Sequence, residues 1–469
     1  MQIPILSGIY TDNSKDFRVS YPRNLVPTSL KTGISNGYLR PCEGITLFSS
    51  PDVGLDRAAI AWNNKCFRLM GDGLVQINQD GQAVIVGGVS NLNNSPATMD
   101  YSFSYLAINS DKKLYLFDGS VLKQVTDPDL GDVLDVIWIG GYFMTTDGEF
   151  VVATELNDPF SVNPLKYGSS EADPDKVVAL KKIRNEAYVV NRHTIEVFDN
   201  IGGDLFPFQR IEGAQIMRGA LHRNCTCVFL DSVAFIGSGR NEGLGIYVAS
   251  AGSSTKISTR DIDLILEQFD EDTLKDVVVE SRVFNGFEHL WVRLPDRTLV
   301  FDAAMTKLFG EAIWFTLTSS NVGLGKLRAV NPVYCYNKWL VGDTESFNVG
   351  YLDDSNHLHW GELIGWEFST VILYNDSVGA LINKMELIGI TGRNNLSDDP
   401  YLFSSYSTDG QQWSNERYIS SGKRGDTTKR LVYVQNGMLR SMRMQKFRGT
   451  SDCRVSFARL ELDLEPLAI

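Results

Sequence analysis

The sequence predicts an all-β fold: an irregular β-propeller of about six or seven blades with a short helical insertion, then a C-terminal antiparallel β-sandwich. Three observations predict it. Short β-type runs are separated by turn dipeptides, equivalent runs recur at a blade-like spacing, and the pattern changes after Trp366. We expect an N-terminal arm and entry corner at 1–44, a propeller-like body at 45–360 and the sandwich at 361–469.

The entry corner is the stretch "SNGYLRPCEGITLF", residues 35–48. Gly37, Pro41 and Gly44 lie so close together that they predict a tight corner rather than regular structure. The corner either builds a catalytic pocket or fixes how the chain enters a scaffold. In the second case Tyr38 and Leu39 anchor in the core while Arg40 reaches a carboxylate.

The propeller body contains seven hairpin-like segments. Their turns are pairs or short runs such as Gly-Asp-Gly, Asp-Gly and Asn-Lys between β-branched and aromatic residues. Equivalent first positions are Cys66, Leu106, Tyr142, Tyr188, Val233, Leu290 and Tyr334, with steps of 40, 36, 46, 45, 57 and 44 residues. Such steps match a four-stranded propeller blade. A pair of stacked sandwiches is the alternative.

The 57-residue step holds the helical insertion, residues 258–282. Ile262, Ile265, Leu266 and Phe269 follow the i, i+3, i+4, i+7 spacing of one helix face. The pattern restarts at 274–278 after an acidic break, which predicts two short helices. They pack either on the propeller rim or on a neighbouring molecule.

The C-terminal region reads as a compact antiparallel domain of about 100 residues. In its last strand the apolar residues are Val455 and Phe457, then Leu460, Leu462 and Leu464. The alternation shifts from odd to even positions, so we expect a β-bulge near Ala458–Arg459.

The formal net charge is −13, which argues against a general nucleic-acid binder. The basic segment, which we define as residues 422–448, has one acid, Asp426, and eight bases. The bases are Lys423, Arg424, Lys429, Arg430, Arg440, Arg443, Lys446 and Arg448. Either they form a solvated strand face, or they contact acidic surface on another copy or another partner.

No catalytic, cofactor-binding or metal-ligating residue is predicted. Cys225-Thr-Cys227 with His222 lacks a second ligand pair at zinc-like spacing, so buried thiols on a strand are favoured. His357 and His359 are interpreted as same-side residues on a strand. "YSTDGQQWS", residues 406–414, resembles the Asp-box hairpin of sialidase propellers, in which an Asp caps its own turn. No sequence signal selects the carboxylate pair of a glycosidase.

The N-terminus lacks a secretory signal, and no apolar run approaches the roughly 18 residues that span a bilayer. The sequence therefore gives no sign of export by that route or of membrane insertion.

The segment "YPRNLVPTSLKTGISNGYLRPCEGI" resembles the N-terminal region of the packaged-DNA stabilisation, or tail-hub, proteins of short-tailed bacteriophages. The matching positions are Pro22, Asn24, Gly37 to Arg40, and Gly44-Ile45. Similar stretches follow in order at 194–198, at 293–303 with Trp314, at 342–352 and at 407–410. The sequence departs from the family at Pro41-Cys42-Glu43, where the family has an aromatic-proline pair.

The resemblance implies a structural virion protein of the tail, made and assembled in the host cytoplasm. Such hubs form a homo-hexameric ring beneath the portal and its adaptor ring, extend the DNA channel, hold the tail needle, offer docking surface to tailspikes and stabilise packaged DNA. DNA would pass without sequence-specific binding, and the basic segment would face protein. The corner at 35–48 then leads the arm into the first blade. The alternatives are a propeller-type virion carbohydrate-binding protein or glycoside hydrolase, and a cytoplasmic propeller adaptor.

Overall fold

The computed structural model describes residues 1–12, 16–29, 33–156, 158–170, 173–203, 205–375, 378–394 and 399–467. The chain forms two units. The propeller unit comprises Leu47–Pro295 and Arg328–Tyr351. The sandwich unit comprises Met1–Thr46, Asp296–Leu327 and Leu352–Ile469.

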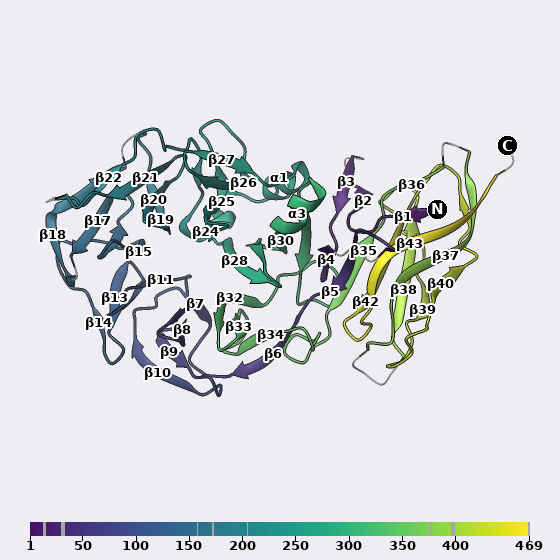
Figure 1. Cartoon of the computed structure of the whole chain (residues 1–469), viewed down its shortest axis with the longest axis horizontal. Coiled ribbons are helices and arrows are strands. Elements are labelled where there is room, and N and C mark those ends of the chain that lie inside the picture. The colour runs from purple at the N-terminus through teal and green to yellow at the C-terminus, as the bar shows by residue number, and fades with distance from the viewer. Residues whose placement is uncertain are drawn as a thin grey trace. The chain divides into compact units, whose positions relative to one another are not determined.

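Antiparallel sheets of four or five short strands make up most of the propeller unit (Figure 1). The first three sheets contain β7 (Asp56–Trp62), β8 (Lys65–Met70), β9 (Gly73–Ile77) and β10 (Ala83–Gly88); β11 (Thr98–Tyr101), β12 (Leu106–Ser110), β13 (Lys113–Phe117) and β14 (Leu122–Gln124); and β15 (Asp135–Ile139), β16 (Tyr142–Thr146), β17 (Phe150–Glu155) and β18 (Asp158–Ser169). The next two contain β19 (Val177–Ile183), β20 (Glu186–Asn191), β21 (Ile195–Asn200) and β22 (Phe208–Arg210); and β23 (Gly219–Ala220), β24 (Thr226–Phe229), β25 (Ser232–Ser238), β26 (Gly245–Ser250) and β27 (Ser253–Lys256). Two further antiparallel groups are β28 (Val278–Phe284) with β29 (Phe287–Arg293), and β32 (Ala329–Cys335) with β33 (Lys338–Asp343) and β34 (Val349–Asp353).

These sheets are arranged radially, with the first strand of each sheet other than the fifth nearest the centre (Figure 1). The innermost strands of consecutive sheets pack on one another, with β24 as the innermost strand of the fifth sheet, and β32 packs on β7. A separate hydrophobic cluster fills the space between neighbouring sheets, such as the one around Trp62, Phe67 and Phe117 between the first two. The alternation of each strand gives it two apolar faces, one for each neighbour. The predicted propeller is confirmed, and the alternative of stacked sandwiches is wrong.

The helical insertion contains the two predicted short helices, α1 (Arg260–Leu266) and α2 (Glu271–Leu274). Ile262, Leu266 and Leu274 are buried, and α1 packs on β26 of its own unit, as expected for rim packing. The predicted insertion extends too far, because residues 278–282 belong to β28. The β-branched Val278 and Val279 fit a strand better than a helix turn.

The sandwich unit consists of two antiparallel sheets and further short elements (Figure 1). One sheet contains β1 (Gln2–Ile3), β4 (Leu25–Ser29), β5 (Gly37–Pro41), β37 (Ala380–Ile390), β40 (Leu431–Val434), β41 (Met438–Leu439) and β43 (Ser456–Pro466). The other contains β35 (Gly365–Ser369), β36 (Leu373–Tyr374), β38 (Tyr401–Ser407), β39 (Arg417–Ser420) and β42 (Met442–Thr450). The remaining elements are β2 (Gly8–Thr11), β3 (Phe17–Ser20), β30 (Thr298–Asp302), α3 (Ala303–Phe309) and β31 (Trp314–Leu317).

Three of the N-terminal strands pair within the C-terminal sheet. β1 pairs with β43, and the order β4-β5-β43 joins chain ends that are more than 400 residues apart in sequence. Sequence patterns do not identify such a distant pairing. The bulge is confirmed, because Ala458 is skipped between the pairs Ile388–Arg459 and Gly389–Phe457.

The prediction that the entry corner is irregular is wrong for most of its length, because β5 (Gly37–Pro41) and β6 (Gly44–Ser49) occupy it and only residues 42–43 separate them. Leu39 is fully buried and Tyr38 half-buried, while Arg40 forms an ion pair with Asp354. Gly44 is required by close approach: a Cβ there would lie 2.5 Å from the carbonyl oxygen of Asn356, which accepts the Gly44 N–H. Both roles predicted for Leu39 and Arg40 are therefore found.

Helix α3 was not predicted from the sequence. It begins after Asp302, whose carboxylate accepts the Met305 N–H at 2.9 Å, and ends at Gly310 with a left-handed φ of 74°.

Within the described part of the chain, no helix has the length and apolar character needed to cross a bilayer.

Candidate functional site

The structure divides the eight bases of the basic segment into those with internal partners and those without. Arg443 belongs to the first group and is buried. It donates from Nη1 to the carbonyl of Asn436 at 2.6 Å and from Nη2 to Gln445 Oε1 at 3.0 Å. Its guanidinium lies 3.9 Å from the ring centroid of Tyr406, and burial lowers its pKa to about 10. Arg443 therefore organises the interior of the sandwich unit.

Lys446 and Arg448 also have partners. Arg448 forms a two-bond ion pair with Glu416 and lies 4.6 Å from the ring centroid of Phe403. Lys446 lies 4.3 Å from the ring centroid of Trp413. These stacked cations belong to strand β42 and brace its sheet.

Arg430 is paired but largely exposed, at 65% of its side chain. Its Nε donates to Glu386 Oε1 at 2.7 Å, and Lys384 lies 2.9 Å from the same carboxylate. Hydrogen bonds from Arg430, followed by those from Lys384, lower the pKa of Glu386 to about 2 against the opposing effect of burial.

The remaining bases are Lys423, Arg424, Lys429 and Arg440. Three are exposed and Lys429 is half-buried, and the described residues include no acidic partner within ion-pair distance of any of them. The sequence treated all eight bases alike, as either a solvated strand face or a contact surface. The structure leaves these four available for contact.

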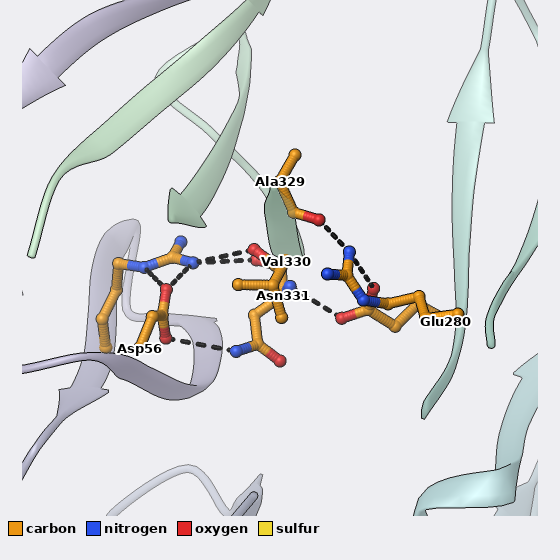
Figure 2. Close-up of polar contacts among 7 residues, drawn as sticks. Asp56, Glu280, Ala329, Val330 and Asn331 are labelled. Carbon is orange, nitrogen blue, oxygen red and sulfur yellow. Dashed lines mark hydrogen bonds and ion pairs between the residues drawn. The ribbon is translucent and has the colours of Figure 1, made fainter. Parts of the chain in front are cut away.

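A buried network of charges joins three sheets near the centre of the propeller unit (Figure 2). Asp56 on β7 and Arg68 on β8 form an ion pair in which both side chains are 0% exposed. Arg68 also donates to the carbonyl of Asn331 at 3.0 Å, and the Asn331 amide donates to Asp56 Oδ1 at 3.2 Å. Burial opposes the charge on Arg68, but the Asp56 carboxylate raises its pKa.

Strand β32 has a bulge between Val330 and Val333, and on its other side it contacts a second acid and a second base (Figure 2). The Asn331 N–H donates to Glu280 Oε1 on β28 at 2.7 Å, and Arg293 on β29 donates to the carbonyl of Ala329. Asn331 adopts a left-handed φ of 50°, which Asn tolerates and which turns its backbone groups toward both neighbours. Burial raises the pKa of Glu280, with Arg293 4.0 Å away.

Other junctions between consecutive sheets are also polar. Arg57 on β7 donates to the carbonyls of Gly71 and Ser95 and to Ser110 Oγ, at 2.8 to 2.9 Å. Asp100 Oδ2 accepts the Trp138 N–H at 2.6 Å. Such bonds satisfy buried backbone groups and restrain the angle between neighbouring sheets.

A large cleft of about 1400 Å³ lies between loops of several propeller sheets. Four of its five lining carboxylates, those of Asp111, Asp147, Asp173 and Asp175, accept hydrogen bonds from the surrounding protein. Asp147 caps its own turn through the N–H groups of Glu149 and Phe150, and Asp173 pairs with Arg240 at 2.8 Å. The described contacts therefore give no carboxylate pair poised for acid–base chemistry.

The two histidine and cysteine motifs do not converge on a metal. His357 Nδ1 lies 3.0 Å from the carbonyl of Cys42, whereas His359 Nδ1 lies 2.8 Å from Ser319 Oγ. The prediction that both lie on one strand is wrong, because residues 357–359 follow a turn and only His359 forms an isolated bridge. Among the described residues, no group of three His, Cys, Asp or Glu side chains could hold a metal ion.

Only one of the two thiols that were predicted to be buried is fully buried, because Cys227 is half-buried. Cys225 is fully buried and its Sγ lies 3.5 Å from the carbonyls of Leu274 and Val277, so burial raises its pKa to about 12. Cys225 ends a 3₁₀ turn (Arg223–Cys225) and Cys227 lies on β24, so only Cys227 is on the predicted strand.

The Asp-box hairpin is confirmed, since Asp409 Oδ1 accepts the N–H groups of Gln411 and Gln412 at 2.9 Å.

Two family models match the chain in order. One, described as the β-propeller of bacteriophage P22 Gp10, matches residues 1–357, and the other, described as its β-sandwich, matches residues 365–465. Among curated proteins, tail hub protein gp10 of Salmonella phage P22 is 24% identical over 489 residues, covering 99% of each chain.

Solved structures with a similar arrangement include the WD40 domain of Neurospora crassa Pan2. It has 9% identity and a TM-score of 0.42, and the match covers 68% of this chain and 98% of that one. The N-terminal domain of Nup159 has 8% identity and a TM-score of 0.42, with 71% and 99% covered.

Proposed function

This chain belongs to the family of bacteriophage P22 Gp10, and from that membership we propose that it is a structural tail hub of a virion. The proposal is carried by the match of both family models, in order, across nearly the whole chain. The tail hub protein gp10 of Salmonella phage P22 covers the same length. The resemblance stated from the sequence is thereby confirmed.

We propose further that six copies form a ring beneath the portal and its adaptor. The ring would extend the DNA channel, hold the tail needle and tailspikes, and stabilise packaged DNA. It would be assembled in the host cytoplasm and have no catalytic role. A hub must transmit load between partners without deforming. The buried junctions between propeller sheets, such as Asp56–Arg68 bound to Asn331, support that role.

The charge distribution supports passage of DNA without tight binding. At −13 per chain, six copies carry a formal charge of −78. Each phosphate bound by a cation would add affinity and slow the movement of DNA. We therefore place the unpaired bases of the basic segment, with Lys423, Arg424 and Arg440 exposed, against acidic protein surface.

The experiment that tests the hub role is electron microscopy of the purified chain, alone and mixed with its cognate portal–adaptor assembly. We expect a six-fold collar that caps the assembly. A chain that remains monomeric and does not bind the connector at micromolar concentration would overturn the proposal.

A further inference from the structure

A second, smaller cleft of about 630 Å³ lies on one end of the propeller unit. Three neighbouring sheets contribute to it through the turns between β7 and β8, β11 and β12, and β32 and β33, with Gln79 from the turn after β9. Turns between the first and second strands of propeller blades lie on the same face, so these loops converge. We call this site the aromatic cleft.

Three exposed rings line the aromatic cleft. Phe103 is 93% exposed, Tyr334 54% and Tyr101 45%. Their exposure leaves apolar ring faces in water, which is unfavourable unless a ligand or partner covers them. Clustering of three such rings in one concave site is typical of a binding site rather than of scattered surface residues.

Exposure of these rings does not come from loose loops. The Trp62 Nε1–H donates to the carbonyl of Ser102 at 3.0 Å, and Ser102 Oγ accepts the Tyr105 N–H at 2.9 Å, so the turn that carries Phe103 is fixed. On the other side, Tyr336 Oη donates to the carbonyl of Ile77 at 2.8 Å. The walls of the cleft are therefore formed before any ligand arrives.

The polar groups of the aromatic cleft are uncharged amides. Asn63, Asn64, Gln79 and Asn337 are exposed, and none of these side chains has a hydrogen-bond partner among the residues the structure describes. No Asp, Glu, Lys or Arg is among the described lining residues, although 22% of the chain is charged. The matching turns of two other sheets carry Arg184 and Asp231 instead.

Flat rings, neutral amides and a lack of charge define one class of ligand. Amide groups both donate and accept hydrogen bonds, as the hydroxyl groups of a sugar require. Ring faces pack against the C–H face of a sugar ring by dispersion. Phosphate-rich or acidic ligands would leave their charge unpaired here.

We propose that the aromatic cleft binds a neutral saccharide, in addition to the hub role and independently of it. The volume of the cleft lies within the range of roughly 300–1,000 Å³ that small-molecule sites occupy. A protein interface of standard size would instead need about 800 Å² of surface on each partner. The size of the cleft therefore suits a small ligand such as a sugar.

The test applies the purified full-length chain to a printed array of neutral bacterial oligosaccharides, with sialylated and phosphorylated oligosaccharides as the charged comparison. Neutral hits are then measured by isothermal titration calorimetry. Phe103→Ala and Tyr334→Ala should each weaken binding by about tenfold. Phe287→Ala is the matched control, because Phe287 is 51% exposed at the equivalent turn of another sheet and does not line the cleft.

The proposal is supported if neutral oligosaccharides bind and only the two cleft variants lose affinity. It is overturned if no neutral oligosaccharide binds, if Phe287→Ala has the same effect, or if the charged oligosaccharides bind better. It is also overturned if Phe103→Ala removes binding to the portal–adaptor assembly and no saccharide binds, since the cleft would then dock protein. Circular dichroism of the variants verifies their folding, which the exposure of Phe103 should leave intact.

Discussion

The two units differ in their most buried ion pairs: among the described residues, only the propeller unit has a pair with both side chains fully buried, although it also has exposed pairs. In the propeller unit, Asp56 and Arg68 are both 0% exposed and lie between sheets. In the sandwich unit, Arg430 is 65% exposed while pairing with Glu386. A buried ion pair stabilises the fold only while both partners are present, because removal of one partner leaves the other as an uncompensated buried charge. An exposed pair contributes little to stability and keeps a cation at the surface. The first arrangement suits a rigid body and the second suits a contact surface.

The largest expected effect comes from breaking the buried pair. Asp56→Ala leaves Arg68 buried without its counter-ion and removes the acceptor of the Asn331 amide. We expect a loss of about 3–5 kcal/mol in the stability of the propeller unit. Urea unfolding followed by tryptophan fluorescence measures it.

The matched control for that change is Asp132→Ala. Asp132 pairs with Lys112 at 2.9 Å, but the side chains are 60% and 62% exposed. Its loss should cost at most about 1 kcal/mol. If the two variants were equally stable, burial would not distinguish the two kinds of ion pair, which both occur in the propeller unit.

The next effect concerns geometry rather than charge. Arg57→Met removes three hydrogen bonds, to the carbonyls of Gly71 and Ser95 and to Ser110 Oγ, and leaves these acceptors without a donor. We expect a cost of about 2 kcal/mol. Arg57→Lys keeps the charge but cannot reproduce the planar fork, so it should lose most of that stability too. Full stability of Arg57→Lys would show that charge alone matters at this junction.

Local patterns in the sequence predicted the propeller, the insertion and the bulge. The hairpins use turn residues, and the bulge at Ala458 follows from an alternation that is visible in five apolar residues. Pairing of β1, β4 and β5 with the C-terminal sheet could not be predicted in this way. This pairing depends on which strand edge is free in the distant C-terminal sheet, and the hydrophobic periodicity of a strand does not identify its partner.

The buried network was also missed, although it left a signal. Arg68 lies within the apolar run Cys66 to Met70, and Arg293 ends the run Leu290 to Arg293. A charge inside a buried strand needs a partner, so each arginine implied an acid nearby. The identity of that acid depends on the closure of the propeller, which brings β7, β28 and β32 together. The basic segment shows the opposite limit. The number of its charges can be read from the sequence, but the burial of Arg443 cannot.

A smaller effect is expected at the exposed pair, and it depends on pH. The pKa of Glu386 is lowered to about 2 from 4.5, mainly by its hydrogen bonds from Arg430, so the pair stabilises the fold above pH 4.5. That contribution is lost as the pH falls from 4.5 toward 2. Arg430→Gln should therefore lower the melting temperature slightly at pH 7, by less than Arg57→Met does. The difference from wild type should disappear near pH 2, as measured by calorimetry.

Lys384 provides the control for that titration. It remains 2.9 Å from Glu386 in the Arg430 variant, so Lys384→Gln combined with Arg430→Gln should raise the pKa of Glu386 further than either change alone. If the difference in melting temperature between Arg430→Gln and wild type persisted unchanged at pH 2, Arg430 would act by packing and not through the Glu386 carboxylate.

The smallest effect on stability, and the one that bears on function, comes from the unpaired bases. The combined variant Lys423→Gln, Arg424→Gln and Arg440→Gln removes three exposed cations that have no acidic partner among the described residues. Stability should change by no more than about 0.5 kcal/mol, since no internal contact is lost. If these cations face acidic protein, association with the portal–adaptor assembly should weaken by about tenfold, chiefly through a slower on-rate, and this difference from wild type should shrink as salt is added. Arg448→Gln is the opposite case: it breaks the pair with Glu416 and should affect stability more than association. If the triple variant associated like wild type at every salt concentration, the basic segment would face solvent and not a partner. The buried junctions of the propeller unit would then be the main physical support for the hub role.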